Sequence, residues 1–301
     1  MKLAYIGLGN LGEHIAMNLV KAGHEVAVFD LNEETGKALI AAGARWASSA
    51  ADAATGAEAV LTCLPSTRAI EIVVGEILTV MPAGSAWLDN STNDRDIIMR
   101  LAELAAAQGV RAVEAPVTGG VHLAKAGEIT VILGGDDEVV QEFMPIFQII
   151  GNRIFHVGGV GQASKIKAIT NMLAFIHLVA DGEALMLAKR GGVDLKLAWD
   201  VIEASSGNSF CHETEGQLIL NGSYNINFTM DLARKDLYFA HQMGREFGVP
   251  LELGGLTEQI FARARAAYGG DAQSPMVVKL LEDAVGTDLR APGFPAELEP
   301  E

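Results

Sequence analysis

The first half of the chain alternates short hydrophobic runs with longer amphipathic segments. Most of the runs are continuous in Val, Ile and Leu, as expected for strands that are buried on both faces. They are LAYIG (3–7), VAVFD (26–30), AVLTCL (59–64), SAWLD (85–89), VRAVEA (110–115), ITVILGG (129–135) and RIFHV (153–157). Several of the segments between them close with glycine, a common helix C-terminal signal. This alternation predicts a doubly wound, mostly parallel sheet of the Rossmann type.

After His156 the strand pattern stops and almost every remaining segment has helical length. The predicted helices are 164–190, 195–205, 212–221, 232–247, 252–268 and 276–285. We therefore predict an α/β protein with a Rossmann domain over 1–161 and an all-α domain for substrate binding and oligomerisation over 162–290, joined by a long helix. The segment 291–301 is predicted to be a poorly ordered tail.

Composition narrows the functional classes. The chain of 301 residues has a formal net charge of −16, which argues against nucleic acid or an anionic membrane surface as a partner. Its two cysteines, Cys63 and Cys211, favour a reducing compartment. The N-terminus enters a strand pattern without a signal peptide, and the most apolar stretch, ITNMLAFIHLVA, is shorter than the roughly 20 residues that span a bilayer. We expect a cytoplasmic protein.

A glycine motif follows the first predicted strand and opens a helix. GLGNLG comprises Gly7, Gly9, Asn10, Leu11 and Gly12, and it matches G-x-G-x-x-G in the context that makes this motif informative. The first glycine permits a tight turn, the second lets a pyrophosphate approach the backbone, and the third lets helix and strand pack closely. The motif predicts a dinucleotide site at the helix N-terminus.

The second predicted strand ends in Asp30, eighteen residues after Gly12. A carboxylate there accepts hydrogen bonds from the ribose hydroxyls of adenosine and repels a 2′-phosphate. The next residues, Leu31 and Asn32, supply no arginine. The sequence therefore predicts NAD rather than NADP. The alternative for Asp30, a helix N-cap or turn aspartate, is less favoured by its position.

Two later segments, Leu64-Pro65 and Ser91-Thr92, follow strands at the edge where open α/β sheets bind ligands. We expect both to close over the cofactor, although each taken alone is equally typical of an ordinary loop.

The segment EAPVTGG (114–120) places the hydroxyl of Thr118 beside Gly119 and Gly120, whose backbone N–H groups can be approached closely. This combination would suit a carboxylate ligand, yet local sequence alone favours a simple strand-to-turn transition. His122 follows two residues later and is a less favoured candidate for the same ligand.

Two lysines, Lys165 and Lys167, lie at a predicted helix start and point about 200° apart. Lys167 shares a small, polar face with Asn171, as a site wall would. Lys165 lies above an apolar stripe that includes Ile169 and Leu173, which we interpret as core. An ammonium in the first helical turn meets the positive end of the helix dipole, which favours the neutral form that a general base needs.

With these motifs in place, the chain resembles the β-hydroxyacid dehydrogenase family, the group of 3-hydroxyisobutyrate and tartronate semialdehyde dehydrogenases related to 6-phosphogluconate dehydrogenase. The resemblance covers nearly the whole length. It rests on GLGNLG (7–12), DNST (89–92), EAPVTGGVHLAKAGEITVILGG (114–135), VGGVGQASKIKAITNML (157–173) and RKDLYFAHQMGREFGVPL (234–251).

The family's catalytic lysine precedes an asparagine by four residues, which selects Lys167 and Asn171. The resemblance implies that Lys167 exchanges the hydroxyl proton while hydride passes between the substrate carbon and nicotinamide C4, and that Asn171 helps to fix the substrate and the lysine. It also implies that Thr118, Gly119 and Gly120 hold the substrate carboxylate.

The resemblance further implies that Lys235, in the KDL sequence, lies over the nicotinamide half of the cofactor, with Leu64 and Thr92 lining the same cleft. Lys235 by itself would be interpreted as a solvated helix charge. The chain departs from the family at Thr118, where serine is usual, and at Ala163, which replaces a glycine of G-x-G-x-x-x-K. These departures bear on the substrate rather than on the reaction class.

The sequence thus predicts an NAD-dependent oxidoreductase for a small β-hydroxy acid such as 3-hydroxyisobutyrate, with no metal required. One alternative is a same-fold reductase of an imine or of a semialdehyde such as tartronate or succinic semialdehyde. Imine reductases of this type typically lack the lysine and prefer NADP, so Lys167 and Asp30 count against them. Another alternative is a non-catalytic NAD-binding scaffold. The size of the apolar helical half predicts a homodimer or homotetramer.

Overall fold

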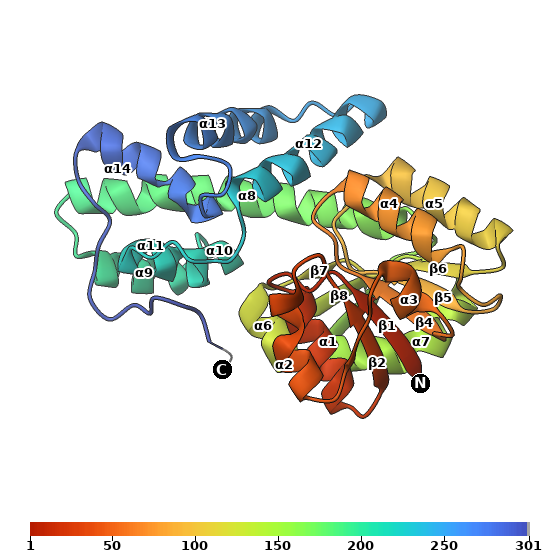
Figure 1. Ribbon diagram of the computed structural model, residues 1–301. Coiled ribbons are helices and arrows are strands. Elements are labelled where there is room, and N and C mark those ends of the chain that lie inside the picture. Colours follow the sequence, from red (N-terminus) through yellow and green to blue (C-terminus); the bar gives the residue numbers. More distant parts are fainter. Residues whose placement is uncertain (300–301) are drawn as a thin grey trace. The chain divides into compact units, whose positions relative to one another are not determined.

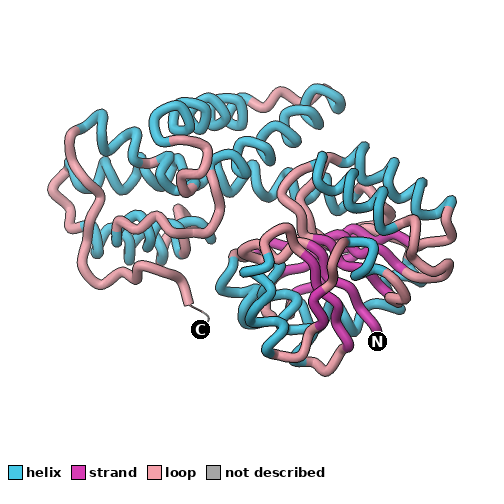
Figure 2. Tube along the Cα trace, viewed as in Figure 1, coloured by secondary structure: helices cyan, strands magenta, loops and turns pink. Residues whose placement is uncertain are grey.

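The computed structural model describes residues 1–299, which form two compact units, 1–167 and 168–299 (Figures 1 and 2). All the named strands belong to the first unit, and the second is built from helices (Figure 2). Helix α8 (Gln162–Arg190) is continuous across the division between the units. It begins next to the predicted domain boundary at residue 161.

The first unit contains a six-stranded parallel sheet in the order β3-β2-β1-β4-β5-β6. Its strands are β1 (Lys2–Ile6), β2 (Glu25–Phe29), β3 (Arg45–Trp46), β4 (Ala59–Thr62), β5 (Ala86–Asp89) and β6 (Arg111–Glu114). A smaller sheet joins β7 (Val117–Thr118), β8 (Thr130–Leu133) and β9 (Arg153–His156), with β7 antiparallel to β8. The predicted Rossmann-type fold is confirmed. Strands β3 and β7 were not predicted because two residues are too few to give a hydrophobic run.

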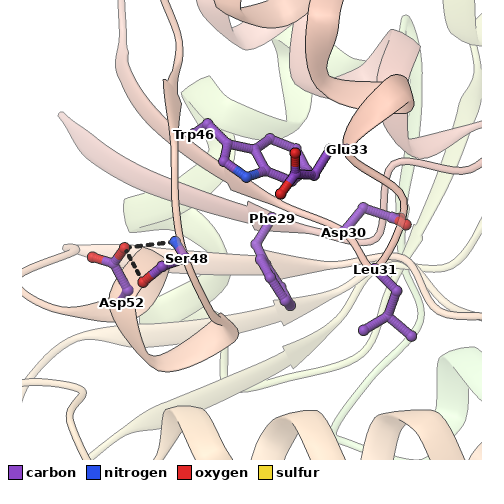
Figure 3. A pocket seen from close by; sticks show the side chains of 7 residues that line it. All are labelled: Phe29, Asp30, Leu31, Glu33, Trp46, Ser48 and Asp52. Atoms are coloured by element: carbon purple, nitrogen blue, oxygen red, sulfur yellow. Dashed lines mark hydrogen bonds between the residues drawn. The ribbon is translucent and has the colours of Figure 1, made fainter.

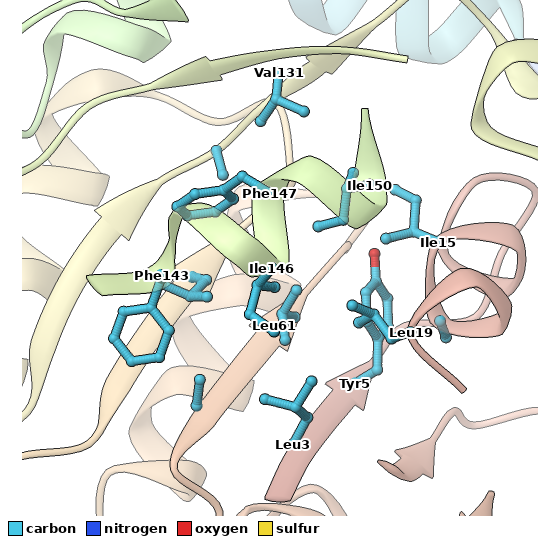
Figure 4. Packing of buried hydrophobic residues seen from close by; sticks show 14 of the residues in the cluster. Leu3, Tyr5, Ile15, Leu19, Leu61, Val131, Phe143, Ile146, Phe147 and Ile150 are labelled. Carbon is cyan, nitrogen blue, oxygen red and sulfur yellow. The ribbon is translucent and has the colours of Figure 1, made fainter. Parts of the chain in front are cut away.

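Helices pack on both faces of the main sheet. They are α1 (Gly12–Lys21), α2 (Lys37–Ala41), α3 (Ala50–Ala54), α4 (Thr67–Ile77), α5 (Arg95–Ala107), α6 (Val121–Ala126) and α7 (Asp137–Ile150), with a 3₁₀ turn, η1, at Glu33–Gly36. Strand β1 shows why the strand sequences are continuously apolar. Leu3 and Tyr5 belong to one core cluster (Figure 4), whereas Ala4 and Ile6 belong to a second, so both faces of the strand are buried.

The second unit packs helices around the C-terminal part of α8. They are α9 (Leu195–Glu203), α10 (Phe210–Glu213), α11 (Glu215–Asn221), α12 (Met230–Phe247), α13 (Glu252–Tyr268) and α14 (Lys279–Val285), with a 3₁₀ turn, η2, at Ser274–Val277. Its core contains Phe175 and Phe261, whose ring centroids are 5.3 Å apart. Phe294, in the predicted tail, is also buried in this core, 5.3 Å from Trp199, because its ring finds an apolar site on α9.

The burial of α8 differs from the prediction in one respect. Lys167 and Asn171 are buried, while Ile169 and Leu173, which were expected to be core, are each 47% exposed. The two lysines do point away from each other, but hydrophobicity alone did not identify the buried side. The whole helix α8, with 29 residues, is long and apolar enough to meet the length and composition criterion of a membrane span, although its most apolar stretch alone is too short. The core helix of a soluble protein can meet the same criterion.

A buried ion pair links α8 to α10 in the second unit. His212 Nδ1 lies 2.5 Å from Asp181 Oδ1, and His212 Nε2 lies 2.9 Å from the carbonyl oxygen of Trp199. A carbonyl oxygen only accepts hydrogen bonds, so Nε2 must carry a proton. A second proton lies in the hydrogen bond between His212 Nδ1 and Asp181 Oδ1. Burial alone would lower the pKa of His212, but its hydrogen bond to Asp181 and the charge of that carboxylate outweigh burial, so the pKa is raised.

This pair predicts that the second unit loses stability as pH rises. A histidine whose folded pKa is raised contributes fully below its ordinary pKa near 6.5, and this contribution disappears as pH passes through the folded value. Urea unfolding between pH 6 and pH 9 should show the decline. His212→Gln should lower the unfolding free energy by about 3–5 kcal/mol at pH 6 and flatten the pH dependence. An unchanged pH dependence in the variant would contradict this assignment.

Candidate active site

The glycine loop between β1 and α1 has the geometry of a phosphate-binding turn. Gly7 has φ +94°, and a Cβ there would lie 2.3 Å from the carbonyl oxygen of Cys63. A Cβ on Gly12 would lie 1.9 Å from the Gly7 carbonyl oxygen, whereas one on Gly9 would meet no atom within 4 Å. Gly7 and Gly12 are therefore required by close packing within the protein, and Gly9 leaves space for a group to approach the loop.

The two residues between Gly9 and Gly12 occupy different environments. Asn10 is exposed at the tip of the loop, and Leu11 is the N-cap of α1 with its side chain packed against the hydrophobic core. No side chain caps this helix, and although the Glu13 N–H donates to the Gly9 carbonyl oxygen at 3.2 Å, the positive end of the helix dipole favours an anion here. The loop thus fits the pyrophosphate of a dinucleotide.

Asp30 lies immediately after β2 and contacts the glycine loop. Its Oδ2 accepts a hydrogen bond of 2.7 Å from the backbone N–H of Leu8, and its Oδ1 accepts one of 2.9 Å from Asn32. Asn32, not Asp30, is the N-cap of the following 3₁₀ turn. The helix-cap alternative for Asp30 is therefore wrong, although the carboxylate does close a local turn.

A cavity of about 450 Å³ adjoins Asp30, within the size range of small-molecule sites (Figure 3). It is lined by Phe29, Asp30, Leu31, Glu33, Trp46, Ser48 and Asp52. The aromatic rings suit an adenine base and the carboxylates suit ribose hydroxyls. This lining contains no basic side chain that would pair with a 2′-phosphate, so it fits NAD better than NADP.

The two loops predicted to close over the cofactor are hydrogen-bonded to each other. The backbone N–H of Leu64 donates to Ser91 Oγ at 2.9 Å, and that hydroxyl donates to Asp89 Oδ1 at 2.6 Å. Asp89 is buried, which raises its pKa, and it also accepts from Thr62 Oγ1 at 2.7 Å. Leu64-Pro65 and Ser91-Thr92 thus lie side by side at the carboxyl edge of β4 and β5.

The Thr118-Gly119-Gly120 segment forms a sharp turn between β7 and α6. Gly119 has φ +129° and Gly120 has φ +89°, conformations that favour glycine. A Cβ on Gly120 would lie 3.1 Å from the His122 ring, so the histidine packs against the turn. Burial lowers the pKa of His122, which keeps it neutral near pH 7. The hydroxyl, the glycines and a neutral imidazole therefore gather at one turn.

Lys167 lies in the second turn of α8, not in the first turn as predicted, because the helix begins at Gln162, so it is farther from the positive end of the helix dipole; it is only 6% exposed. Lys165 is on the other side of the helix, with Nζ 3.5 Å from Gln162 Oε1 at the exposed surface. The two lysines point to different sides of the helix, as the helical phase predicted, but the side of Lys165 is not the buried one that was expected. Burial of a lysine is uncommon, and buried titratable groups cluster at functional sites, which makes Lys167 the candidate for chemistry.

In the second unit, Asn171 is held by a carboxylate. Its Nδ2 donates to Asp236 Oδ2 at 2.6 Å, and Lys235 Nζ lies 3.3 Å from Asp236 Oδ1. The side chain of Lys235 is 20% exposed and its Nζ lies 5.5 Å from the centre of the Phe239 ring. Lys235 is therefore not the solvated helix charge that its sequence context suggested.

Sequence reasoning missed several residues that organise these sites. Asp236 follows Lys235 directly, and the KDL sequence could have indicated it. Asp89 ends an otherwise apolar strand, and Glu114 follows the apolar pair Ala112-Val113 at the end of β6, a pattern that indicates a buried role. Among residues 1–299, no group of three or more His, Cys, Asp and Glu side chains is arranged to hold a metal ion.

Comparisons with known proteins agree with these features. The NAD binding domain of 6-phosphogluconate dehydrogenase matches residues 2–158, and the NAD-binding domain of NADP-dependent 3-hydroxyisobutyrate dehydrogenase matches residues 161–281. The chain is 32% identical to a 2-(hydroxymethyl)glutarate dehydrogenase of Eubacterium barkeri, over 96% of this chain and 97% of that protein. It is 33% identical to a 3-hydroxyisobutyrate dehydrogenase of Pseudomonas aeruginosa, over 89% and 94% respectively.

A solved structure of Mycobacterium tuberculosis 3-hydroxyisobutyrate dehydrogenase with L-serine is similar with a TM-score of 0.83 and 28% identity, covering 93% of this chain and 98% of that one. Fold, glycine loop and sequence matches together define an NAD-dependent dehydrogenase of hydroxy acids. The chain belongs to the β-hydroxyacid dehydrogenase family, and the predicted resemblance is confirmed.

The carboxylate lining beside Asp30 predicts a clear cofactor preference. The kcat/KM for NAD should exceed that for NADP, and Asp30→Ala should reduce the preference by about tenfold or more, since one good hydrogen bond to a charged group contributes about 1.5–3 kcal/mol. Glu34→Gln is a suitable control because Glu34 pairs with Lys37 and does not line the cavity. A wild-type preference for NADP would refute the prediction.

Proposed function

We propose that this enzyme oxidises a small β-hydroxy acid to the corresponding semialdehyde, with Lys167 taking the hydroxyl proton. The observation that carries the proposal is the burial of Lys167 in the unit that also holds the glycine loop and the Thr118-Gly119-Gly120 turn. A buried lysine supplies the proton acceptor, the loop fits the dinucleotide, and the turn offers a hydroxyl and backbone amides to a carboxylate.

The named ligands of similar proteins indicate the substrate class. 2-(Hydroxymethyl)glutarate, 3-hydroxyisobutyrate and L-serine all carry a primary alcohol on the carbon next to the one that bears the carboxylate. They differ only in the other substituent of the carbon that bears the carboxylate. We therefore assign the substrate as a 3-hydroxypropanoate with one substituent at C2.

The protein's part in the reaction is to orient the alcohol and move its proton. Thr118, Gly119 and Gly120 bind the carboxylate, which holds the alcohol carbon of the substrate at a fixed position in the site. Neutral Lys167 accepts the hydroxyl proton and, as an ammonium, then hydrogen-bonds the carbonyl oxygen of the product. Asn171, oriented by Asp236, would help to fix the substrate, as the family resemblance implies. Bound NAD supplies the hydride acceptor.

The reverse reaction, reduction of a semialdehyde, uses the same groups. Lys167 would then begin as the ammonium and donate its proton to the forming alkoxide, so the two directions have opposite pH dependences. A buried amine is more typical of a reactive site than of a non-catalytic scaffold, so the burial of Lys167 favours this family of reactions.

We also propose a cytoplasmic homodimer or homotetramer without a nucleic-acid or membrane partner. Support comes from the net charge of −16 and from the exposed apolar side chains of Ile169, Leu173 and Leu187 on α8, which a second copy would cover. Light scattering should give a mass of two or four chains of 31.8 kDa. A monomer at micromolar concentration would sink this part of the proposal.

A panel assay tests the function itself. NADH formation should be measurable with at least one of 3-hydroxyisobutyrate, 2-(hydroxymethyl)glutarate and L-serine, and it should be weaker with 2-hydroxy acids because their alcohol is one bond closer to the carboxylate.

Lys167→Ala should lower kcat by about 10²–10⁴-fold with NAD binding unchanged. Lys165→Ala, the matched control on the opposite side of α8, should alter kcat less than about twofold, since exposed charges contribute little. Equal losses in both variants would overturn the assignment of Lys167.

A further inference from the structure

Glu114 is a buried carboxylate that the proposed reaction does not use. It ends β6, and its side chain accepts hydrogen bonds from three donors: the backbone N–H of Gly161, the backbone N–H of Ser164 at 3.1 Å, and the Ser164 hydroxyl. All three donors lie at the start of α8. Glu114 is 3% exposed. Its carboxylate therefore fixes the N-terminal end of the helix that carries Lys167.

The backbone of Glu114 is fixed as firmly as its side chain. Its N–H donates to the Gly134 carbonyl oxygen at 2.8 Å, and the Gly134 N–H donates back at 2.9 Å, which joins β6 to the strand that ends at Leu133. Four residues after Glu114 the chain reaches Thr118, the first residue of the proposed carboxylate turn. One residue thus connects the substrate turn, through its backbone, with the start of α8, through its side chain.

The space around the carboxylate is closely filled. A Cβ on Gly134 would lie 2.5 Å from Glu114 Oε2 and 3.1 Å from the Ala163 Cβ. The absence of a side chain at Gly134 therefore makes room for both groups. Such packing leaves Glu114 little freedom to relax.

The position of Ser164 extends this restraint to Lys167. The two residues are three apart on α8, so they are neighbours on one side of the helix, about 4.5 Å apart along its axis at 1.5 Å per residue. Both are buried, at 7% and 6% exposure. A negative charge at this end of the helix also offsets the positive end of its dipole. Burial raises the pKa of Glu114 and the charge of Asp89 adds to the rise, while the hydrogen bonds from Ser164 and Gly161 oppose it and favour the carboxylate.

We propose that Glu114 is a positioning residue for Lys167. It holds the first turns of α8 at a set distance from the Thr118-Gly119-Gly120 turn, and its charge increases the affinity of the lysine for a proton. This inference rests on the proposed function, because it assigns to Glu114 a role in the proton transfer of Lys167.

Glu114→Gln tests the proposal with little change of volume. The variant should lower kcat by about 100-fold, the effect of misplacing a catalytic group by about 1 Å, while the KM for NAD stays within twofold. The acidic limb of the kcat/KM profile for oxidation should move down by about one pH unit, because loss of a nearby negative charge favours the neutral lysine. Glu114→Asp keeps the charge but loses reach, so its acidic limb should stay at the wild-type pH while kcat falls.

Glu282→Gln is the matched control for lost stability. Glu282 is equally buried, at 2% exposure, and accepts from Leu289 N at 2.7 Å, from Arg290 Nη1 at 2.9 Å and from the Tyr224 hydroxyl, all in the second unit. Its variant should lower the thermal midpoint but leave kcat and the pH profile at wild-type values. A pH shift of the same size in this control would mean that the effect of Glu114→Gln is only destabilisation.

The remaining outcomes separate the two proposals. Wild-type kcat and an unshifted pH profile in Glu114→Gln, with an active wild-type enzyme, would overturn the positioning role alone. A wild-type enzyme that turns over no β-hydroxy acid would overturn the proposed function and this inference with it.

If Glu114→Gln does not fold, the Ser164→Ala variant tests the proposal instead. It removes one donor and should lower kcat by about tenfold, in line with a hydrogen bond to a charged group, and an unchanged kcat would contradict the proposal.

Discussion

The hydrogen bonds between the Glu114 carboxylate and the start of α8 are the interaction on which the arrangement of the first unit depends. A carboxylate without partners in this position would carry a large desolvation cost, and three donors offset it. The donors are provided only when the helix begins at the right place beside β6. The hydrogen bonds that offset the desolvation cost of the buried carboxylate therefore also fix the position of the helix that carries Lys167.

A second constraint operates at the glycine loop. Gly7 and Gly12 are packed so closely against neighbouring carbonyl groups that no larger residue fits, and this packing sets the turn that would receive a pyrophosphate. Asp30 holds the same turn through the N–H of Leu8. The carboxylate that we expect to bind the ribose thus also accepts a hydrogen bond from the glycine loop, which would couple cofactor preference and loop geometry in one side chain.

Much of this organisation was predictable from local sequence. Continuous apolar runs identified the strands because residues such as Tyr5 and Ile6 face two different cores, and helical phase alone separated Lys165 from Lys167. The contacts that sequence reasoning did not predict involve residues distant in sequence. Glu114 finds its partners 47 and 50 residues away, and Asp236 meets Asn171 across 65 residues. No periodicity signals such contacts. For the same reason, the exposure of the apolar side of α8 and the burial of Phe294 did not follow from hydrophobicity.

The central claim is that the amine of Lys167 itself exchanges the substrate proton. Chemical rescue tests it most directly, by measuring NADH formation by Lys167→Ala with saturating β-hydroxy acid as small primary amines are added. If Lys167 is the proton acceptor, added amine restores turnover in a concentration-dependent way, and the rescue increases with the basicity of the amine. If no amine restores turnover in a folded variant that still binds NAD, Lys167 serves structure rather than proton transfer, and the account is wrong.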